Sequence, residues 1–92
     1  MPVLSPTELT QALTQLPGWE LSEGALTRTF SFSDFREAMS FINSVAAVAE
    51  RAGHHPDIDI RYNKVKLALS SHDAGGITEK DFSLAGEIGR IL

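Results

Sequence analysis

Cysteine is absent from this chain, which excludes disulfide bonds and thiolate metal sites. Long apolar runs are absent too, because Ser, Asn and Gly interrupt the longest uncharged stretches. A membrane-spanning helix needs roughly 20 apolar residues, so none is expected. The first four residues lack the basic flank and the apolar stretch of a secretory signal. These absences predict a soluble, cytoplasmic protein with no membrane partner.

Positive charge is scarce as well. The chain has 8 Lys and Arg against 12 Asp and Glu, a net charge of −4 at pH 7, and the basic residues are spread along its length. A protein that binds a nucleic-acid backbone is expected to concentrate positive charge instead. The composition therefore argues against direct nucleic-acid binding.

The length and composition fit one small globular domain. With 92 residues, 42% of them hydrophobic and 22% charged, the chain is too short for a two-domain enzyme and too apolar for a disordered tail. We therefore expect a single domain over residues 1–92. Because the core of so short a chain is small, burial of further apolar surface between subunits would add stability. A homo-oligomer is expected.

The first third of the chain predicts a helix and a hairpin. Ser5 and Glu8 have the spacing of a helix capping box, and apolar residues at helical spacing follow them, which predicts a helix over residues 6–16. Residues 19–21 and 26–32 alternate with period two around a short loop that contains glycine, so they predict two paired strands.

A long helix of about five turns is predicted after Ser33, where apolar residues from Phe35 on recur every three or four positions until Gly53. Phe41, Val48 and Ala52 form a second apolar stripe beside the first. The apolar arc is therefore wider than one sheet face requires. It indicates either a subunit contact or a deeply buried helix, and the sequence does not choose between them.

The last third predicts a second strand pair and a closing helix. Residues 58–62 and 65–69 alternate with period two, and Asn63 with Lys64 fits a two-residue turn between them. A Thr-x-x-Asp capping pattern at residues 78–81 then precedes an amphipathic helix. The predicted order is α-β-β-α-β-β-α. The predicted fold is an α+β domain with a four-stranded antiparallel sheet whose helices pack on one face.

All three histidines fall at one end of the second strand pair. With the predicted turn, Tyr62 faces Val65, and counting outward along the strands brings His55 opposite His72, with His54 at the junction of helix and strand. Directly opposed residues have Cβ atoms about 4.5–5.5 Å apart. The register therefore predicts that these two imidazoles meet.

Three interpretations of this histidine cluster stay open. The residues can be polar loop residues that gather by chance. They can bind a metal, because three imidazoles suffice for a catalytic zinc site, although adjacent His54 and His55 point apart in an extended chain and the usual ligand spacings are missing. They can also perform general acid–base catalysis, for which imidazole suits neutral pH.

Two acidic residues belong to the same question. Glu50 lies in the last turn of the long helix, where the helix dipole disfavours an anion, and it would lie near His54 if the helix continued. It is either a functional residue or a solvated surface residue. Asp81 has a structural role as the acid of the capping box with Thr78, and this role is compatible with orienting a substrate.

Several of these residues belong to motifs with fixed spacing: Glu50-x-x-x-His54-His55-Pro56, Tyr62-Asn63-Lys64-Val65, His72 and Gly76-Ile77-Thr78-x-x-Asp81. With Gly18-Trp19 and Phe30-x-Phe32, the motifs span nearly the whole chain. In these motifs the sequence resembles the pterin-4a-carbinolamine dehydratase family. The resemblance implies an α+β fold with a four-stranded antiparallel sheet, assembled into homodimers or homotetramers.

The resemblance also implies an enzymatic activity. Members of the family dehydrate a 4a-hydroxytetrahydropterin (4a-carbinolamine) to the quinonoid dihydropterin, a step that recycles a tetrahydrobiopterin-type cofactor after aromatic amino acid hydroxylation. Hydroxide leaves C4a while a ring nitrogen loses a proton, so one group must donate a proton and another must accept one. No metal or organic cofactor is implied.

The same resemblance implies roles for individual residues. The three histidines would be catalytic, with His55 as the principal acid–base residue and with His54 and His72 as binding or proton-transfer partners. Glu50 would orient a histidine, and Trp19 would flank the flat pterin ring, although a lone tryptophan is more often a core residue than a ligand contact. The residues with binding or orienting roles would be Glu50, Pro56, Asp81 and Trp19.

The sequence departs from the family pattern in two places. Residues 57–60 read Asp-Ile-Asp-Ile where some relatives carry aromatic residues, and Gly75-Gly76 is expected to make the loop after His72 more pliant. Both departures leave the preferred pterin side chain open.

A second class of function stays open. Some proteins with this fold act as dimerisation cofactors of a transcription factor or as assembly factors. A non-catalytic descendant is expected to lose the catalytic histidines, and all of them are present here. If a protein partner binds, the stripe of Phe41, Val48 and Ala52 is the predicted surface.

Overall fold

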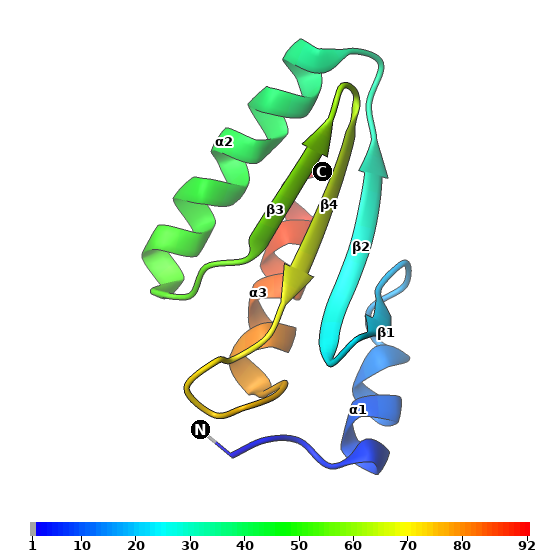
Figure 1. Ribbon diagram of the computed structural model, residues 1–92, viewed down its shortest axis with the longest axis vertical. Coiled ribbons are helices and arrows are strands. Elements are labelled where there is room, and N and C mark those ends of the chain that lie inside the picture. The colour runs from blue at the N-terminus through cyan, green and yellow to red at the C-terminus, as the bar shows by residue number, and fades with distance from the viewer. Residues whose placement is uncertain (1) are drawn as a thin grey trace.

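The computed structural model describes residues 2–92 and has three helices and four strands (Figure 1). The strands form one antiparallel sheet in the order β1-β2-β4-β3. This confirms the predicted α+β fold and the predicted order of elements. In chain order the elements are α1 (Pro6–Leu13), β1 (Glu20–Ser22), β2 (Ala25–Ser31), α2 (Phe35–Ala52), β3 (Asp57–Arg61), β4 (Lys64–Leu69) and α3 (Glu79–Arg90).

One face of the sheet is buried beneath helices. Helix α2 packs against β4 and α3, and Figure 1 shows α3 behind the sheet. The other face carries polar residues such as Asp59, which pairs with Lys66 across β3 and β4. Alternation of apolar and polar residues along each strand produces this division. The strand residues in the core are Leu26, Phe30, Val65, Leu67 and Leu69.

Helix α1 begins with the predicted capping box. The Ser5 hydroxyl accepts the Glu8 N–H at 3.2 Å, and the Glu8 carboxylate accepts the Ser5 N–H at 2.8 Å. The hydrogen bond that the Glu8 carboxylate accepts from the Ser5 backbone, and after it the nearby Ser5 hydroxyl, hold the pKa of Glu8 below its usual 4.5. Since the folded-state pKa is lowered, the stabilisation is present above pH 4.5 and is lost as the pH falls through the folded value.

The first helix is shorter than predicted. It ends at Leu13, and the chain continues to Leu16 in tighter turns whose backbone hydrogen bonds span three residues. Pro17 explains the difference, because a proline disfavours helical geometry at the residue before it.

Helix α2 has the predicted length of about five turns and the predicted stop at Gly53. Asp34 caps its first turn by accepting the Glu37 N–H, and Gly53 ends the helix in a left-handed conformation with φ of 63°. Of the two interpretations of the second stripe, the structure favours the deeply buried helix over the subunit contact for Phe41 and Val48. Their exposed fractions are 6% and 3%, because both side chains lie in the core of their own chain.

The turn between β3 and β4 differs from the prediction. It consists of Tyr62 and Asn63, with Arg61 paired to Lys64, so each residue of β3 faces a residue two positions earlier in β4 than predicted. The Asn63 side-chain amide donates to the Phe32 carbonyl oxygen at 2.8 Å, and the Asn63 backbone carbonyl oxygen accepts the Phe32 N–H at 2.9 Å. These bonds hold Asn63 against the end of β2, and Tyr62 adopts the left-handed φ of 55° instead.

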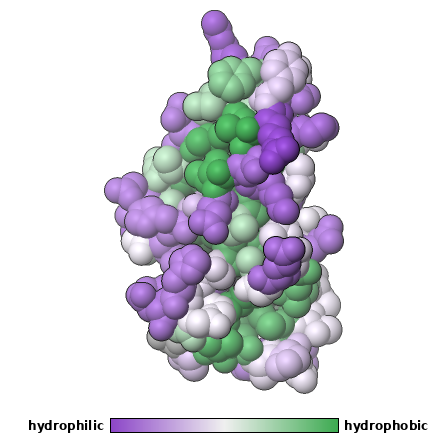
Figure 2. Space-filling view, in the orientation of Figure 1, coloured by the Kyte–Doolittle hydropathy of each residue, from purple (hydrophilic) through white to green (hydrophobic). Residues whose placement is uncertain are grey.

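The hydropathy of the surface is mixed. Figure 2 shows hydrophilic side chains over much of the visible face, with hydrophobic patches between them. Across residues 2–92, no helix combines the length and the apolarity that crossing a bilayer requires.

Candidate active site

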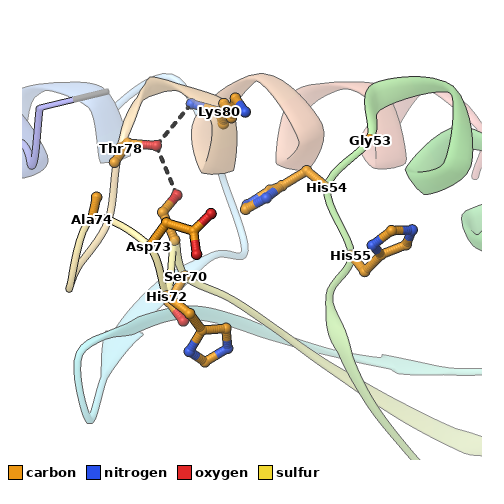
Figure 3. A pocket seen from close by; sticks show the side chains of 10 residues that line it. Gly53, His54, His55, Ser70, His72, Asp73, Ala74, Thr78 and Lys80 are labelled. Carbon is orange, nitrogen blue, oxygen red and sulfur yellow. Dashed lines mark hydrogen bonds between the residues drawn. The ribbon is translucent and has the colours of Figure 1, made fainter.

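The end of α2 sets the directions of the first two histidines. The His54 N–H donates to the Ala49 carbonyl at 3.2 Å across the left-handed Gly53, which closes the helix and turns the chain. Pro56 then favours an extended backbone at His55 before β3 begins. The two rings consequently point in different directions, as Figure 3 shows.

His54 points toward α3 and meets a buried carboxylate. Its Nε2 lies 2.5 Å from Asp81 Oδ1, with the His54 side chain 15% exposed and the Asp81 side chain fully buried. An ionised carboxylate only accepts hydrogen bonds, so Nε2 is the donor. In the neutral ring this leaves Nδ1 without the proton, as the nitrogen that can accept one.

The second oxygen of Asp81 belongs to the cap of α3. Asp81 Oδ2 accepts the Thr78 N–H and the Ser71 hydroxyl, each at 2.9 Å. The predicted capping box is therefore confirmed. The same carboxylate both caps the helix and holds His54.

His55 points back to α2 and meets an exposed carboxylate. Its Nε2 pairs with Glu50 Oε2, and the two side chains are 62% and 74% exposed. The expected proximity of Glu50 to His54 is wrong. Because Gly53 ends the helix, His54 leaves the helical path toward Asp81, and His55 takes the place beside Glu50.

His72 lies on a short loop between β4 and α3. A bridge between Ser71 and Gly76 closes this loop, and Gly75 donates its N–H to the carbonyl oxygens of Ser71 and His72. Gly75 has φ of 78°, a conformation that other residues adopt at a cost. The loop glycine therefore defines the turn that presents His72.

The three histidines border one open cavity of about 400 Å³ (Figure 3). This volume is within the range of small-molecule sites. The predicted pairing of His55 with His72 is wrong, because the observed register, continued beyond Asp57, places His55 opposite Ser70. The predicted gathering of the three imidazoles at one site is nevertheless observed. The cavity is lined by Gly53, His54, His55, Ser70, Ser71, His72, Asp73, Ala74, Thr78 and Lys80.

The structure does not bring Trp19 to this cavity. Trp19 is 6% exposed and packs edge-to-face on Phe30 in the core, with ring centroids 6.1 Å apart. Pro56 follows His55 directly but does not line the cavity. Within residues 2–92, no three His, Asp or Glu side chains are grouped as a metal site requires.

Sequence reasoning missed Ser71, Asp73 and Lys80, all of which line the cavity. A signal for Ser71 was present. It continues the inward-facing alternation of Leu67 and Leu69 along β4, so its hydroxyl occupies a core position. A buried hydroxyl needs a hydrogen-bond partner, and only the folded structure shows that the partner is the carboxylate that holds His54.

Comparison with known proteins shows which proteins this chain is similar to. A protein of Chloroflexus aurantiacus, provisionally named as a pterin-4-alpha-carbinolamine dehydratase, is 54% identical over 100% of this chain and 99% of its own. The crystal structure of a transcriptional coactivator/pterin dehydratase from Brucella melitensis matches with a TM-score of 0.92 and 36% identity, covering 97% of both chains. A pterin dehydratase-like RuBisCO assembly factor of the alpha-carboxysome, at 22% identity and a TM-score of 0.64, covers 79% of this chain and 84% of its own and shares the fold.

The family model described as pterin 4 alpha carbinolamine dehydratase matches residues 2–91. This match covers every helix and strand of the fold and all three histidines of the cavity. The chain therefore belongs to the pterin-4a-carbinolamine dehydratase family.

Proposed function

We propose that this protein dehydrates a 4a-hydroxytetrahydropterin to the quinonoid dihydropterin and water by histidine acid–base catalysis, in the recycling of a tetrahydrobiopterin-type cofactor. The observation that carries the proposal is the gathering of three imidazoles on one cavity, two of them paired through Nε2 with a carboxylate. Membership of the family supports the reaction class.

The reaction needs two proton transfers. The C4a–O bond breaks as the departing hydroxyl takes a proton and leaves as water, and a ring nitrogen of the pterin loses a proton to a base. An imidazolium can supply the first proton and a neutral imidazole can take the second. Proton donor and acceptor are both restored when the proton passes between them through the solvent, so the scheme requires no metal or organic cofactor.

The carboxylate partners favour these roles. We assign His55 as the principal acid–base residue, because it lines the open cavity and Glu50 pairs with its ring. Asp81 holds His54 at a fixed orientation as a second proton-transfer group. His72 binds substrate or transfers a proton from the opposite loop.

The experiment follows the breakdown of freshly generated 4a-carbinolamine tetrahydropterin by ultraviolet absorbance, with wild-type protein, His55→Ala and added chelator. We expect the wild type to accelerate breakdown with chelator present, and His55→Ala to lose about 100-fold or more of this rate. Arg61→Ala is the control. Arg61 is exposed at the far end of β3, so this variant is expected to keep wild-type activity.

Both parts of the proposal can fail separately. Normal turnover by a folded His55→Ala protein would refute the role of His55. Absence of acceleration by the folded wild type would refute the dehydratase activity itself and would favour the protein-binding alternative.

The alternative is a dimerisation cofactor or assembly factor, with or without catalysis. The Brucella melitensis relative is named as a transcriptional coactivator/pterin dehydratase, and this name supports the alternative function. Phe41 and Val48 no longer serve as its surface, since both are buried in the core.

A further inference from the structure

Ser71 is a buried polar residue behind the histidine cavity. It is 8% exposed, and its neighbours Thr78 and Asp81 are fully buried. Its Oγ lies 2.9 Å from Asp81 Oδ2 and 2.8 Å from Thr78 Oγ1. The Ser71 hydroxyl therefore joins the cap of α3 to the carboxylate that holds His54.

The direction of each hydrogen bond in this group is determined by its two ends. The Lys80 N–H can only donate, and it donates to Thr78 Oγ1 at 3.3 Å, as Figure 3 shows. At the other end, the Asp81 carboxylate can only accept. The Thr78 hydroxyl must consequently donate to Ser71 Oγ, and the Ser71 hydroxyl must donate to Asp81 Oδ2.

The two oxygens of the Asp81 carboxylate have different hydrogen-bond partners. Oδ2 receives the Ser71 hydroxyl and the Thr78 N–H, each at 2.9 Å, and Oδ1 receives His54 Nε2 at 2.5 Å. The carboxylate is held on one side by the protein and is presented to the imidazole on the other. Because its only hydroxyl hydrogen is used by Asp81, Ser71 cannot also donate to a substrate.

We propose that Ser71 is a positioning residue: its hydroxyl fixes the Asp81 carboxylate, which in turn holds neutral His54 as the Nε2–H tautomer with Nδ1 available as a base. The effect on rate rests on the proposed dehydratase function. The effect on the His54 tautomer does not, because it depends only on the hydrogen bonds within the chain.

The test compares Ser71→Ala with the wild type by two measurements. In the dehydratase assay we expect kcat to fall about tenfold, the effect of losing one hydrogen bond to a charged group, with KM unchanged within about twofold. In ¹⁵N spectra of the imidazoles we expect neutral His54 to be the Nε2–H tautomer in the wild type, and to show a larger Nδ1–H fraction in Ser71→Ala. Ser71→Thr keeps the hydroxyl, so it is expected to keep the wild-type kcat and the wild-type His54 tautomer.

Two further variants separate positioning from stability. Ser5→Ala removes the cap of α1, far from the cavity, so it should lower the melting temperature without changing kcat or the His54 spectrum. Ser71→Cys keeps the size of the side chain but has a much weaker donor. If Ser71→Ala does not fold, Ser71→Cys tests the positioning role in its place.

The outcomes distinguish the two proposals. Wild-type kcat together with an unchanged His54 tautomer in a folded Ser71 variant would overturn the positioning role. A rise in KM with unchanged kcat would overturn it too, because it would show that Ser71 binds substrate. If the wild type has no dehydratase activity, the proposed function fails and the His54 spectra alone decide the role of Ser71.

Discussion

At the scale of single residues, the two histidine–carboxylate pairs differ chiefly in burial. Asp81 is fully buried against a 15% exposed His54, whereas Glu50 and His55 are both more than half exposed. Water screens an exposed pair and solvates whichever partner remains after a mutation. Water cannot solvate in this way the partners that remain when a buried carboxylate is removed. The same chemical pair therefore has different consequences for stability in the two places.

Asp81→Ala is expected to lower the free energy of unfolding by about 3 kcal/mol, because it leaves the buried donors of Ser71, Thr78 and His54 without their acceptor. Glu50→Ala is expected to lower it by less than about 1 kcal/mol. Urea denaturation of both variants measures the difference. Equal losses of stability would contradict the assignment of the structural role to Asp81.

The sequence predicted the members of the site better than their contacts. Their place at one end of the second strand pair grouped the three histidines, and the family resemblance added roles for Glu50 and Asp81. Helical spacing would bring Glu50 near His54 if the helix continued, but Gly53 ends the helix and redirects the chain. The contact of His54 with Asp81 joins residues 27 positions apart, and periodicity within either helix carries no information about it.

At the scale of secondary-structure elements, one position in a turn decided the register. The alternation along β3 and β4 was read correctly, since a shift by two residues keeps every side chain on its face. What failed was the position of the turn. Local preference favours Asn63 with a positive φ, but Asn63 is held by Phe32 from another element, and Tyr62 takes the left-handed position.

The loop that carries His72 gives an element-scale prediction with a matched control. Gly75→Ala places a side chain at φ of 78° and should destabilise the protein by about 1–2 kcal/mol. Gly86→Ala lies inside α3 and should stabilise it by about 0.5–1 kcal/mol. Neither new Cβ would meet another atom within 4 Å, so backbone conformation alone sets the sign.

Thermal denaturation of the two glycine variants measures this contrast. The melting temperature should fall for Gly75→Ala and rise for Gly86→Ala. An unchanged or higher melting temperature for Gly75→Ala would show that the loop changes conformation readily, as the sequence-based expectation of a pliant loop has it. A fall for Gly86→Ala would contradict the expected gain in helix stability.

At the scale of the whole molecule, the fold was accessible from sequence because each element carries its own signal. Capping residues mark the helices, alternation marks the strands, and short hairpin loops require antiparallel neighbours. Local signals in the sequence did not predict how deeply α2 is buried. Phe41 is buried because Phe30 and Phe32 pack on its ring from β2 and the segment after it, and only the assembled core shows this.

The expected homo-oligomer is the prediction that belongs to this scale. The single chain leaves several large apolar side chains exposed, including Phe35 at 51% on α2 and Ile58 at 41% on the edge strand β3. Burial of such surface between subunits would supplement a small core. We expect light scattering to give a mass two or four times that of the 10.0 kDa chain. The melting temperature should rise with protein concentration, because association stabilises the folded chain. A mass of one chain and a melting temperature independent of concentration would contradict this prediction, and stability would then rest on the core of the single chain.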